Sequence, residues 1–274
     1  MNIETKAFFA AFAATSSIFF GMGAAKAQDA DPATRDGFSG TIAGGVATVP
    51  EYEGAARQRV IPLVSGELRW DKRYFAIEGV TARMNVLNSA TFEFGPAADL
   101  TFGRRASVKS PAVRALGRID DAYQIGAFAA VKTASLITEG DELRLSVQGT
   151  RDVSNVHKGW VGEAAVKYRL PVGRKLALAT QVAMRFADDN YARTYFSVSP
   201  AGAAASGLVP FAAKGGVKDI GVSMTATYAL SDRWSLLGYG GYRRLVGDFA
   251  DSPVVSKAGD RNQLTGGVGV GFSF

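Results

Sequence analysis

Apolar and polar residues alternate with a period of two along most of this chain. In the stretch 175–186, KLALATQVAMRF, large apolar side chains recur at alternate positions, and Gln181 and Arg185 lie between them. Successive side chains of a β-strand point to opposite faces, so this pattern predicts a strand with one apolar and one polar face. The pattern recurs in ten further stretches: 37–49, 59–70, 73–84, 91–102, 123–132, 142–150, 160–169, 222–230, 233–245 and 263–274.

The connections between these stretches have two sizes. Residues 170–175 and 230–234 form tight turns, whereas 103–122, 187–216 and 246–262 are long and rich in polar or small residues. Short turns at one end and long loops at the other are typical of outer-membrane barrels. We therefore predict an all-β fold, a transmembrane antiparallel up-and-down β-barrel. A soluble barrel, with the apolar face turned inward, remains the alternative at this point.

The strand count follows from closure. Bacterial single-chain barrels have an even number of strands, and eleven stretches are found. We assign the twelfth strand to 190–199, NYARTYFSVS, and keep ten or fourteen strands as alternatives. In the first third of the chain, WDKR (70–73) and NVLN (85–88) both look like short turns. Two short turns in succession do not fit a barrel in which short turns and long loops alternate.

Aromatic residues favour the membrane barrel. Amphipathic rings form girdles at the two membrane interfaces, and eight rings lie near predicted strand ends: Trp70, Tyr74, Tyr123, Trp160, Tyr168, Tyr228, Trp234 and Tyr242. The last strand ends on a bare aromatic residue, with Val268, Val270, Phe272 and Phe274 on one face. This ending resembles the signal by which outer-membrane barrels are recognised for assembly.

Composition narrows the class of protein further. The chain has 274 residues, 20% charged residues and no cysteine, so neither bulk disorder nor a disulfide scaffold is expected. The net charge of +6 is mildly basic. It fits attraction to an anionic lipid or polymer, and nothing in it indicates nucleic acid.

The first residues resemble an export signal. Lys6 precedes an apolar run, and Ala25–Ala27 has the small-x-small pattern that signal peptidase accepts. We predict that 1–27 is a cleaved signal peptide, with cleavage between Ala27 and Gln28, and that 28–274 is a single barrel domain. A membrane-anchoring helix is the alternative. No later stretch reaches the roughly 18 apolar residues of a transmembrane helix.

Candidate chemistry is sparse. The single histidine, His157, has Ser154 and Asp152 nearby in sequence, but a triad requires a shared site, and we expect a loop histidine near a membrane interface. The acidic stretches 139–142 and 187–189 are expected to be solvated turns rather than calcium sites. GGVGVG (266–271) lacks the Lys-Ser/Thr pair and the helix of a nucleotide loop. We predict no catalytic, metal-binding or cofactor-binding residues, and no cofactor.

One loop is strongly basic. The stretch 103–118 holds Arg104, Arg105, Lys109, Arg114 and Arg118. At the outer end of a barrel these side chains could bind lipopolysaccharide phosphates through charge-assisted hydrogen bonds. A solubilising loop is the alternative.

Three stretches carry a resemblance to a known family. The stretch 49–63 contains Tyr52, Gly54 and Pro62; 189–221 contains Tyr191, Tyr195, Gly207, Gly215 and Gly216; and 242–255 contains Asp248, Ser252 and Pro253. With the Phe-terminal strand, these motifs make nearly the whole mature chain similar to the MipA/OmpV family of outer-membrane scaffolding proteins. Ser197 departs from the family pattern, in which a Gly often follows the Tyr-Phe pair.

The resemblance implies a non-enzymatic barrel in the outer membrane of a Gram-negative cell. It also implies partners, a murein transglycosylase and a murein synthase that the barrel brings together, in addition to outer-membrane lipid. Two other hypotheses stay open: a porin-like channel or osmotically regulated protein for small solutes, and an outer-membrane enzyme.

Overall fold

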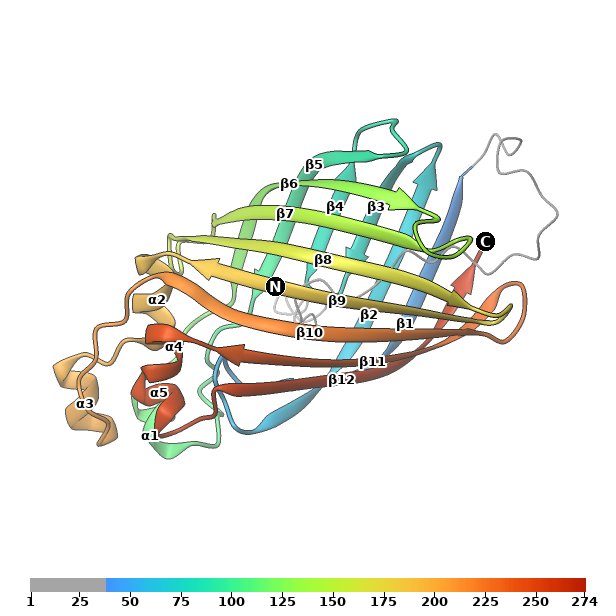
Figure 1. Cartoon of the computed structure of the whole chain (residues 1–274). Helices are drawn as coiled ribbons and strands as arrows, with labels where there is room; N and C mark the ends of the chain where they lie inside the picture. The colour runs from blue at the N-terminus through green and yellow to red at the C-terminus, as the bar shows by residue number, and fades with distance from the viewer. Residues whose placement is uncertain (1–37) are drawn as a thin grey trace, which may run out of the picture.

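A computed structural model describes residues 38–274 as a closed barrel of twelve antiparallel strands (Figure 1). The predicted cleavage site at Ala27 and Gln28 lies outside these residues. The strands are β1 (Ser39–Pro50), β2 (Gln58–Trp70), β3 (Arg73–Glu78), β4 (Thr81–Asn85), β5 (Phe92–Thr101), β6 (Ala122–Ala134), β7 (Glu142–Asp152), β8 (Trp160–Val172), β9 (Leu176–Ala187), β10 (Gly216–Ala229), β11 (Trp234–Leu245) and β12 (Asn262–Ser273). Each strand pairs with its neighbours in sequence, and β1 pairs with β12, from Thr41↔Ser273 to Thr48↔Gly266.

Five short helices gather at one end of the barrel (Figure 1). They are α1 (Pro111–Ala115), α2 (Asp189–Phe196), α3 (Pro200–Ser206), α4 (Gly247–Asp251) and α5 (Pro253–Ser256). All three long loops predicted from the sequence lie at this helical end, and the tight turns after β8 and β10 lie at the opposite, turn end. Among residues 38–274 no helix is long and apolar enough to cross a membrane.

The apolar faces of the strands point outward. Val268 and Leu264 of β12 are 60% and 58% exposed, whereas Gln263 and Thr265 on the opposite face are buried in the lumen. In β9, Val182 is 51% exposed and Gln181 is buried. This is the reverse of a soluble barrel, and it is the arrangement that a lipid environment requires.

Most of the predicted aromatic residues lie on this outer wall. Tyr123, Trp160 and Tyr242 lie at the helical end, whereas Trp70, Tyr168, Tyr228 and Trp234 lie at the turn end, so the rings form two bands. The prediction for Tyr74 was wrong. Its side chain is buried in the lumen, where its hydroxyl donates to Glu93 Oε2 at 3.0 Å.

The predicted count of twelve strands is confirmed, but the assignment of the twelfth to 190–199 was wrong. That stretch forms α2, because the Asp188 side chain accepts the backbone N–H of Tyr191 and caps the helix. The missing strand comes from 73–84, which turns at Gly79–Val80 and pairs Glu78 with Thr81. This turn lies between the two short turns that the sequence had placed in succession, at 71–72 and 86–91. The connections therefore alternate regularly between the two ends of the barrel.

Candidate functional site

The three motif stretches, distant in sequence, meet at the helical end and close it. We call this assembly the cap: the loop 51–57 together with 188–215 and 246–261. The Tyr52 hydroxyl donates to the Ala258 carbonyl at 3.0 Å, and the Asp260 N–H donates to the Gly54 carbonyl at 2.8 Å. The first motif is thereby attached to the end of the loop 246–261, which follows the third motif.

The second and third motifs are joined in the same way. The Ser252 hydroxyl donates to the Phe196 carbonyl at 2.5 Å, and the Lys214 N–H donates to Asp248 Oδ2 at 2.8 Å. Side chains that bind backbone groups of another loop fix the relative position of both loops. Most of the predicted motif positions therefore lie in or beside one structure, while Pro62 lies apart, on the outer face of β2.

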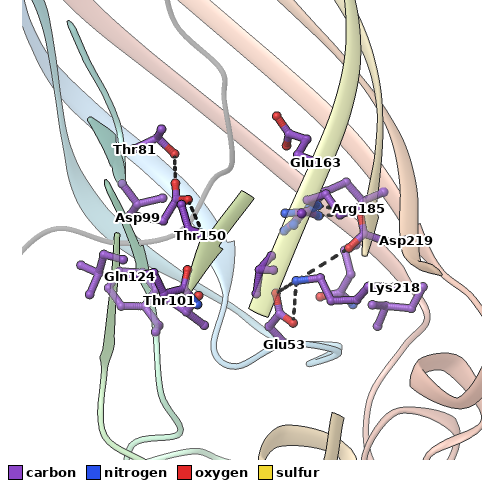
Figure 2. A pocket seen from close by; sticks show the side chains of 18 of the residues that line it. Glu53, Thr81, Asp99, Thr101, Gln124, Thr150, Glu163, Arg185, Lys218 and Asp219 are labelled. Carbon is purple, nitrogen blue, oxygen red and sulfur yellow. Dashed lines mark hydrogen bonds and ion pairs between the residues drawn. The ribbon is translucent and has the colours of Figure 1, made fainter. Parts of the chain in front are cut away.

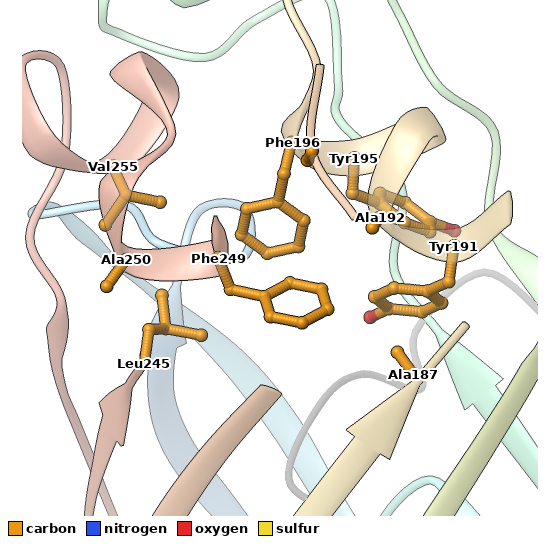
Figure 3. Packing of buried hydrophobic residues seen from close by; sticks show 10 residues of the cluster. Ala187, Tyr191, Ala192, Tyr195, Phe196, Leu245, Phe249, Ala250 and Val255 are labelled. Atoms are coloured by element: carbon orange, nitrogen blue, oxygen red, sulfur yellow. The ribbon is translucent and has the colours of Figure 1, made fainter. Parts of the chain in front are cut away.

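A small apolar core holds the cap together (Figure 3). The Phe196 and Phe249 rings meet edge to face with their centroids 5.0 Å apart, an arrangement that aromatic pairs prefer. Tyr191 and Val255 are buried in the same cluster. Since α2 and α4 contribute most of these side chains, packing against each other helps to stabilise both helices.

Gly54 is required by this packing. Its φ of +87° is one that residues with a Cβ rarely adopt, and a Cβ placed there would lie 2.3 Å from Val255 Cγ2. Gly207 has a related role at a helix end, because it terminates α3 in the left-handed conformation, with φ of +73°.

His157 lies in the loop between β7 and β8, as predicted, and beneath the cap. Its place near a membrane interface stays a prediction. Its ring is buried, accepts the Gly159 N–H at Nδ1 and pairs through Nε2 with the Gln124 side chain at 2.8 Å. Burial lowers the pKa of its imidazole, and it is therefore neutral at pH 7. Ser154 donates to Asp152, which accepts the backbone rather than the ring N–H of His157, so the three residues do not form a catalytic triad.

A buried ionic network connects the cap to the barrel wall. Lys218 Nζ donates to both carboxylate oxygens of Glu53, at 2.8 and 3.1 Å, and the Tyr191 hydroxyl donates to Glu53 Oε2 at 2.7 Å. Burial alone would raise the pKa of the Glu53 carboxyl, but the charges of Lys218, Arg185 and Arg243 outweigh it and lower that pKa to about 2. Glu53 is thus ionised and fixes the loop 51–57 over the lumen.

An irregularity in β10 makes this network possible. The register between β9 and β10 shifts between Val217 and Asp219, as at a β-bulge. Lys218 and Asp219 are consecutive, and a regular strand would place one of them outside. Instead both are buried, and Asp219 accepts the Arg185 guanidinium at 2.6 Å.

Beneath the cap the lumen holds a chamber that is partly open to solvent (Figure 2). On one wall the Asp99 carboxylate accepts from Thr81 Oγ1 at 2.6 Å, Gln148 Nε2 at 2.6 Å and Thr150 Oγ1 at 3.0 Å. The opposite wall carries the Lys218 network (Figure 2). Apolar side chains such as Leu100 and Phe102 also line the chamber.

Towards the turn end, a layer of charged side chains crosses the lumen. Lys167 of β8 lies 4.0 Å from Glu78 of β3, and Arg83 of β4 lies 3.9 Å from Glu163 of β8. These pairs join walls that are four or five strands apart, so they bridge the barrel. Glu93 adds a further group, with Lys132 at 3.0 Å and Arg144 at 2.9 Å.

The sequence identified part of this interior. The alternation predicted a polar face that holds Gln181 and Arg185, and both line the lumen, as do Arg144, Glu163 and Lys167. Glu53, Asp99, Lys218 and Asp219 were missed. Adjacent opposite charges at 218–219, inside an otherwise alternating stretch, were the available signal of a bulge.

The predicted assembly signal lies on the outer wall at the turn end. Val268, Val270 and Phe274 are exposed, and the Phe272 ring packs on Trp234 with centroids 5.0 Å apart. Phe274 and Gly40 exchange backbone hydrogen bonds, each of 3.0 Å. The last residue is therefore part of the closing seam between β1 and β12.

Comparisons with known proteins agree with this architecture. Residues 42–274 match the model of the family described as MltA-interacting protein MipA. The Escherichia coli K12 protein YiaT, whose name places it in the outer membrane, is 32% identical over 124 residues, which are 45% of this chain and 48% of YiaT; the O157:H7 protein matches equally. The chain spans about half the length of these curated relatives.

Two solved structures are similar in outline. The COG4313 outer membrane channel from Pseudomonas putida F1 has a TM-score of 0.47 at 13% identity, covering 90% of this chain and 100% of that one. The NanC porin has a TM-score of 0.41 at 8% identity, covering 85% and 98%. The family match extends over nearly all of the described barrel, and the chain therefore belongs to the family of the MltA-interacting protein MipA, as a β-barrel of the outer membrane.

Proposed function

We propose that this protein is a non-catalytic scaffold that holds a murein transglycosylase, and with it a murein synthase, at the inner face of the outer membrane. The family description names an interaction with MltA. The observation that carries the proposal is the charged layer across the lumen, Lys167–Glu78 and Arg83–Glu163. A barrel that is bridged from wall to wall leaves its ends, rather than a passage, for function.

The turn end offers a suitable contact for such a partner, since short turns of outer-membrane barrels face the periplasm. The loop 135–141 presents Leu136 and Ile137, which are 55% and 75% exposed. Asp141 holds this loop in one conformation, because its carboxylate accepts the N–H groups of Leu136, Ile137 and Thr138 at 2.7–2.8 Å. An apolar tip on a preorganised loop loses little entropy on binding.

The test is capture of a purified murein transglycosylase by the detergent-solubilised barrel. Ile137→Asp is expected to weaken capture about 30-fold, the effect of losing one interface hot spot. The matched control is Val209→Asp, an equally exposed apolar residue (61%) at the helical end, which should leave capture unchanged. If the wild type captures no transglycosylase, or if both variants behave alike, the scaffold role at this end is wrong.

A porin-like channel is the second candidate, favoured by the polar lumen and by a further cavity beyond the chamber. Planar-bilayer recording separates the two. The scaffold predicts no steady conductance from the wild-type barrel, whereas ohmic conductance at neutral pH would support the channel.

We also propose that the helical end binds lipopolysaccharide phosphates. Arg105, Lys109, Arg114 and Arg118 are exposed there, whereas Arg104 is buried and donates to the Tyr195 carbonyl at 3.1 Å, so it takes no part. Replacing Arg114 and Arg118 by Gln should reduce retention of lipopolysaccharide through purification. Unchanged retention would contradict this assignment.

Export and assembly complete the proposal. Cleavage between Ala27 and Gln28 predicts that the mass of the protein from outer membranes is that of residues 28–274. Phe274 is proposed as the assembly signal with Val268, Val270 and Phe272, and deleting Phe274 should leave unassembled protein in the periplasm. An uncleaved chain, or normal assembly of the deletion variant, would contradict these two assignments.

A further inference from the structure

One cation on a wall of the chamber beneath the cap is left over by the ion pairs of that wall. Arg185, Lys218 and Arg243 line this wall together with the carboxylates of Glu53, Glu163 and Asp219. Arg185 is paired with Asp219 and Lys218 with Glu53. The remaining cation is Arg243.

Arg243 lines the chamber, and its side chain makes no hydrogen bond or ion pair with any other residue in the described part of the chain. Its side chain is only half-buried, so the guanidinium is accessible from the chamber. A guanidinium has five N–H donors in a planar fork that matches a carboxylate. The charged groups around it are Arg185, Asp219 and Glu53. Its side chain is hydrogen-bonded to neither carboxylate, so its donors are left for a negatively charged ligand.

The opposite wall carries the complementary group. Asp99 accepts only from neutral donors, the side chains of Thr81, Gln148 and Thr150. No Lys or Arg among residues 38–274 forms an ion pair with it. A carboxylate has about four acceptor sites, so three bonds leave one site and the full negative charge for a cation.

The barrel geometry fixes the distance between these two groups. Asp99 lies on β5 and Arg243 on β11, six strands apart in a ring of twelve, so they lie on opposite walls. Twelve strands spaced about 4.8 Å apart and tilted by about 40° close a wall of about 24 Å in diameter. After allowance for the two side chains and for contact distances, a bridging ligand needs charges roughly 10 Å apart, the length of about three extended residues.

We propose that the chamber binds a short zwitterionic peptide of about three residues, with its carboxylate on Arg243 and its ammonium group on Asp99. The apolar residues between the walls, among them Leu100, Phe102 and Val161, would contact its side chains. A chamber that is mainly apolar with a few convergent polar groups is typical of a small-molecule site. This site does not depend on the scaffold role, because it lies inside the barrel and away from the turn end.

The probe is trialanine, titrated calorimetrically into the full-length folded barrel in detergent. We expect saturable binding, and about 10- to 100-fold weaker binding by Arg243→Gln, the loss of a charge-assisted hydrogen bond pair. The matched control is Arg244→Gln. Arg244 is the next residue, faces outward and contacts Asn262 Oδ1 at 3.3 Å, so its replacement should leave binding unchanged.

Two blocked peptides assign the ends. Acetyl-trialanine lacks the ammonium group and should bind weakly to the wild type, with no further loss on Asp99→Asn. Trialanine amide lacks the carboxylate and should bind weakly, with no further loss on Arg243→Gln. Folding of each variant is checked by its change in gel mobility on boiling, and Arg243→Lys, which keeps the charge, should retain part of the affinity.

The proposal is overturned if trialanine does not bind, if folded Arg243→Gln and Arg244→Gln bind it equally, or if the blocked peptides bind as well as trialanine. None of these outcomes bears on capture of a transglycosylase. A failed scaffold and an empty chamber are therefore distinguishable.

Discussion

Glu53 is the residue on which the cap depends most. It receives hydrogen bonds from Lys218 and Tyr191, and Lys218 is almost completely buried. Removing one partner of a buried ion pair leaves an uncompensated charge, which costs more than removing a single hydrogen bond to a charged group. The two kinds of contact can therefore be separated by mutation.

Glu53→Gln is expected to destabilise the cap by about 4 kcal/mol and Tyr191→Phe by about 2 kcal/mol. Hydrogen exchange of the amides in 188–215 measures both. Glu139→Gln, at an exposed position in a turn-end loop, serves as the control and should not alter exchange. Equal effects of Glu53→Gln and Tyr191→Phe would show that the ion pair contributes nothing beyond its hydrogen bonds.

The same residues predict how the cap responds to pH. Burial lowers the pKa of His157 below its ordinary value of 6.5, so the open cap binds a proton more readily than the closed one. The pKa of Glu53 is lowered from 4.5 to about 2. Cap stability should be full above pH 6.5, decrease as the pH falls below 6.5, and decrease again between pH 4.5 and 2.

His157→Gln should abolish the decrease below pH 6.5 and preserve the one below pH 4.5. Hydrogen exchange of the cap, corrected for the intrinsic pH dependence of exchange, reports both steps. A wild-type cap that becomes more stable as the pH falls from 7 to 5 would contradict the expected direction of the change.

Gly54 and Gly173 both have a positive φ, a backbone conformation that favours glycine. Gly54→Ala introduces both an unfavourable φ and a contact with Val255. Gly173 has a similar φ of +64°, but nothing lies within 4 Å of the Cβ it lacks. The pair therefore separates backbone strain from packing.

We expect Gly54→Ala to destabilise the closed cap by at least about 2 kcal/mol, the combined cost of strain and overpacking. The cap should therefore be cleaved more readily by protease. Gly173→Ala should cost only about 1 kcal/mol and act at the turn end. Limited proteolysis of the folded barrel distinguishes the two sites. Equal protection of the cap in both variants would mean that the contact with Val255 does not hold the loop.

The period-two pattern predicted the regular strands correctly. It failed where capping, helical packing or a tight turn determines the local structure. The strands 160–169 and 175–186 follow from alternation alone. The helix α2 could have been recognised from Asp188 as N-cap and from the buried pairs Tyr191–Tyr195 and Ala192–Phe196, four residues apart. Glu78-Gly79-Val80-Thr81 has only one turn-forming residue and was therefore read as continuous strand.

The candidate site was harder to predict, because its members are paired across the lumen. Most motif residues were named from resemblance, and the structure brings them together as a cap, yet Asp99 and Arg243 share no sequence motif. Their relation follows only from a ring of twelve strands that places β5 opposite β11. Sequence alone could not give this relation without the correct strand count.

The whole barrel rests on one arrangement, an apolar wall facing lipid and a charged interior. Both follow from the alternation of apolar and polar residues. Val182 is exposed on the outer wall, whereas its neighbour Gln181 is buried in the lumen. The cap, the chamber and the turn-end loop all depend on it. A soluble barrel of the same sequence would place the charges of the lumen in bulk solvent.

Lipid contact at these two neighbouring positions tests this arrangement most directly, and a chain without cysteine is suited to the experiment. Bimane is attached to Val182→Cys or Gln181→Cys in barrels reconstituted into bilayers with brominated lipid. We predict strong quenching at position 182 and little at 181, where a water-soluble quencher should act instead. The reverse order, or equal quenching at both positions, would contradict the outward-facing apolar wall.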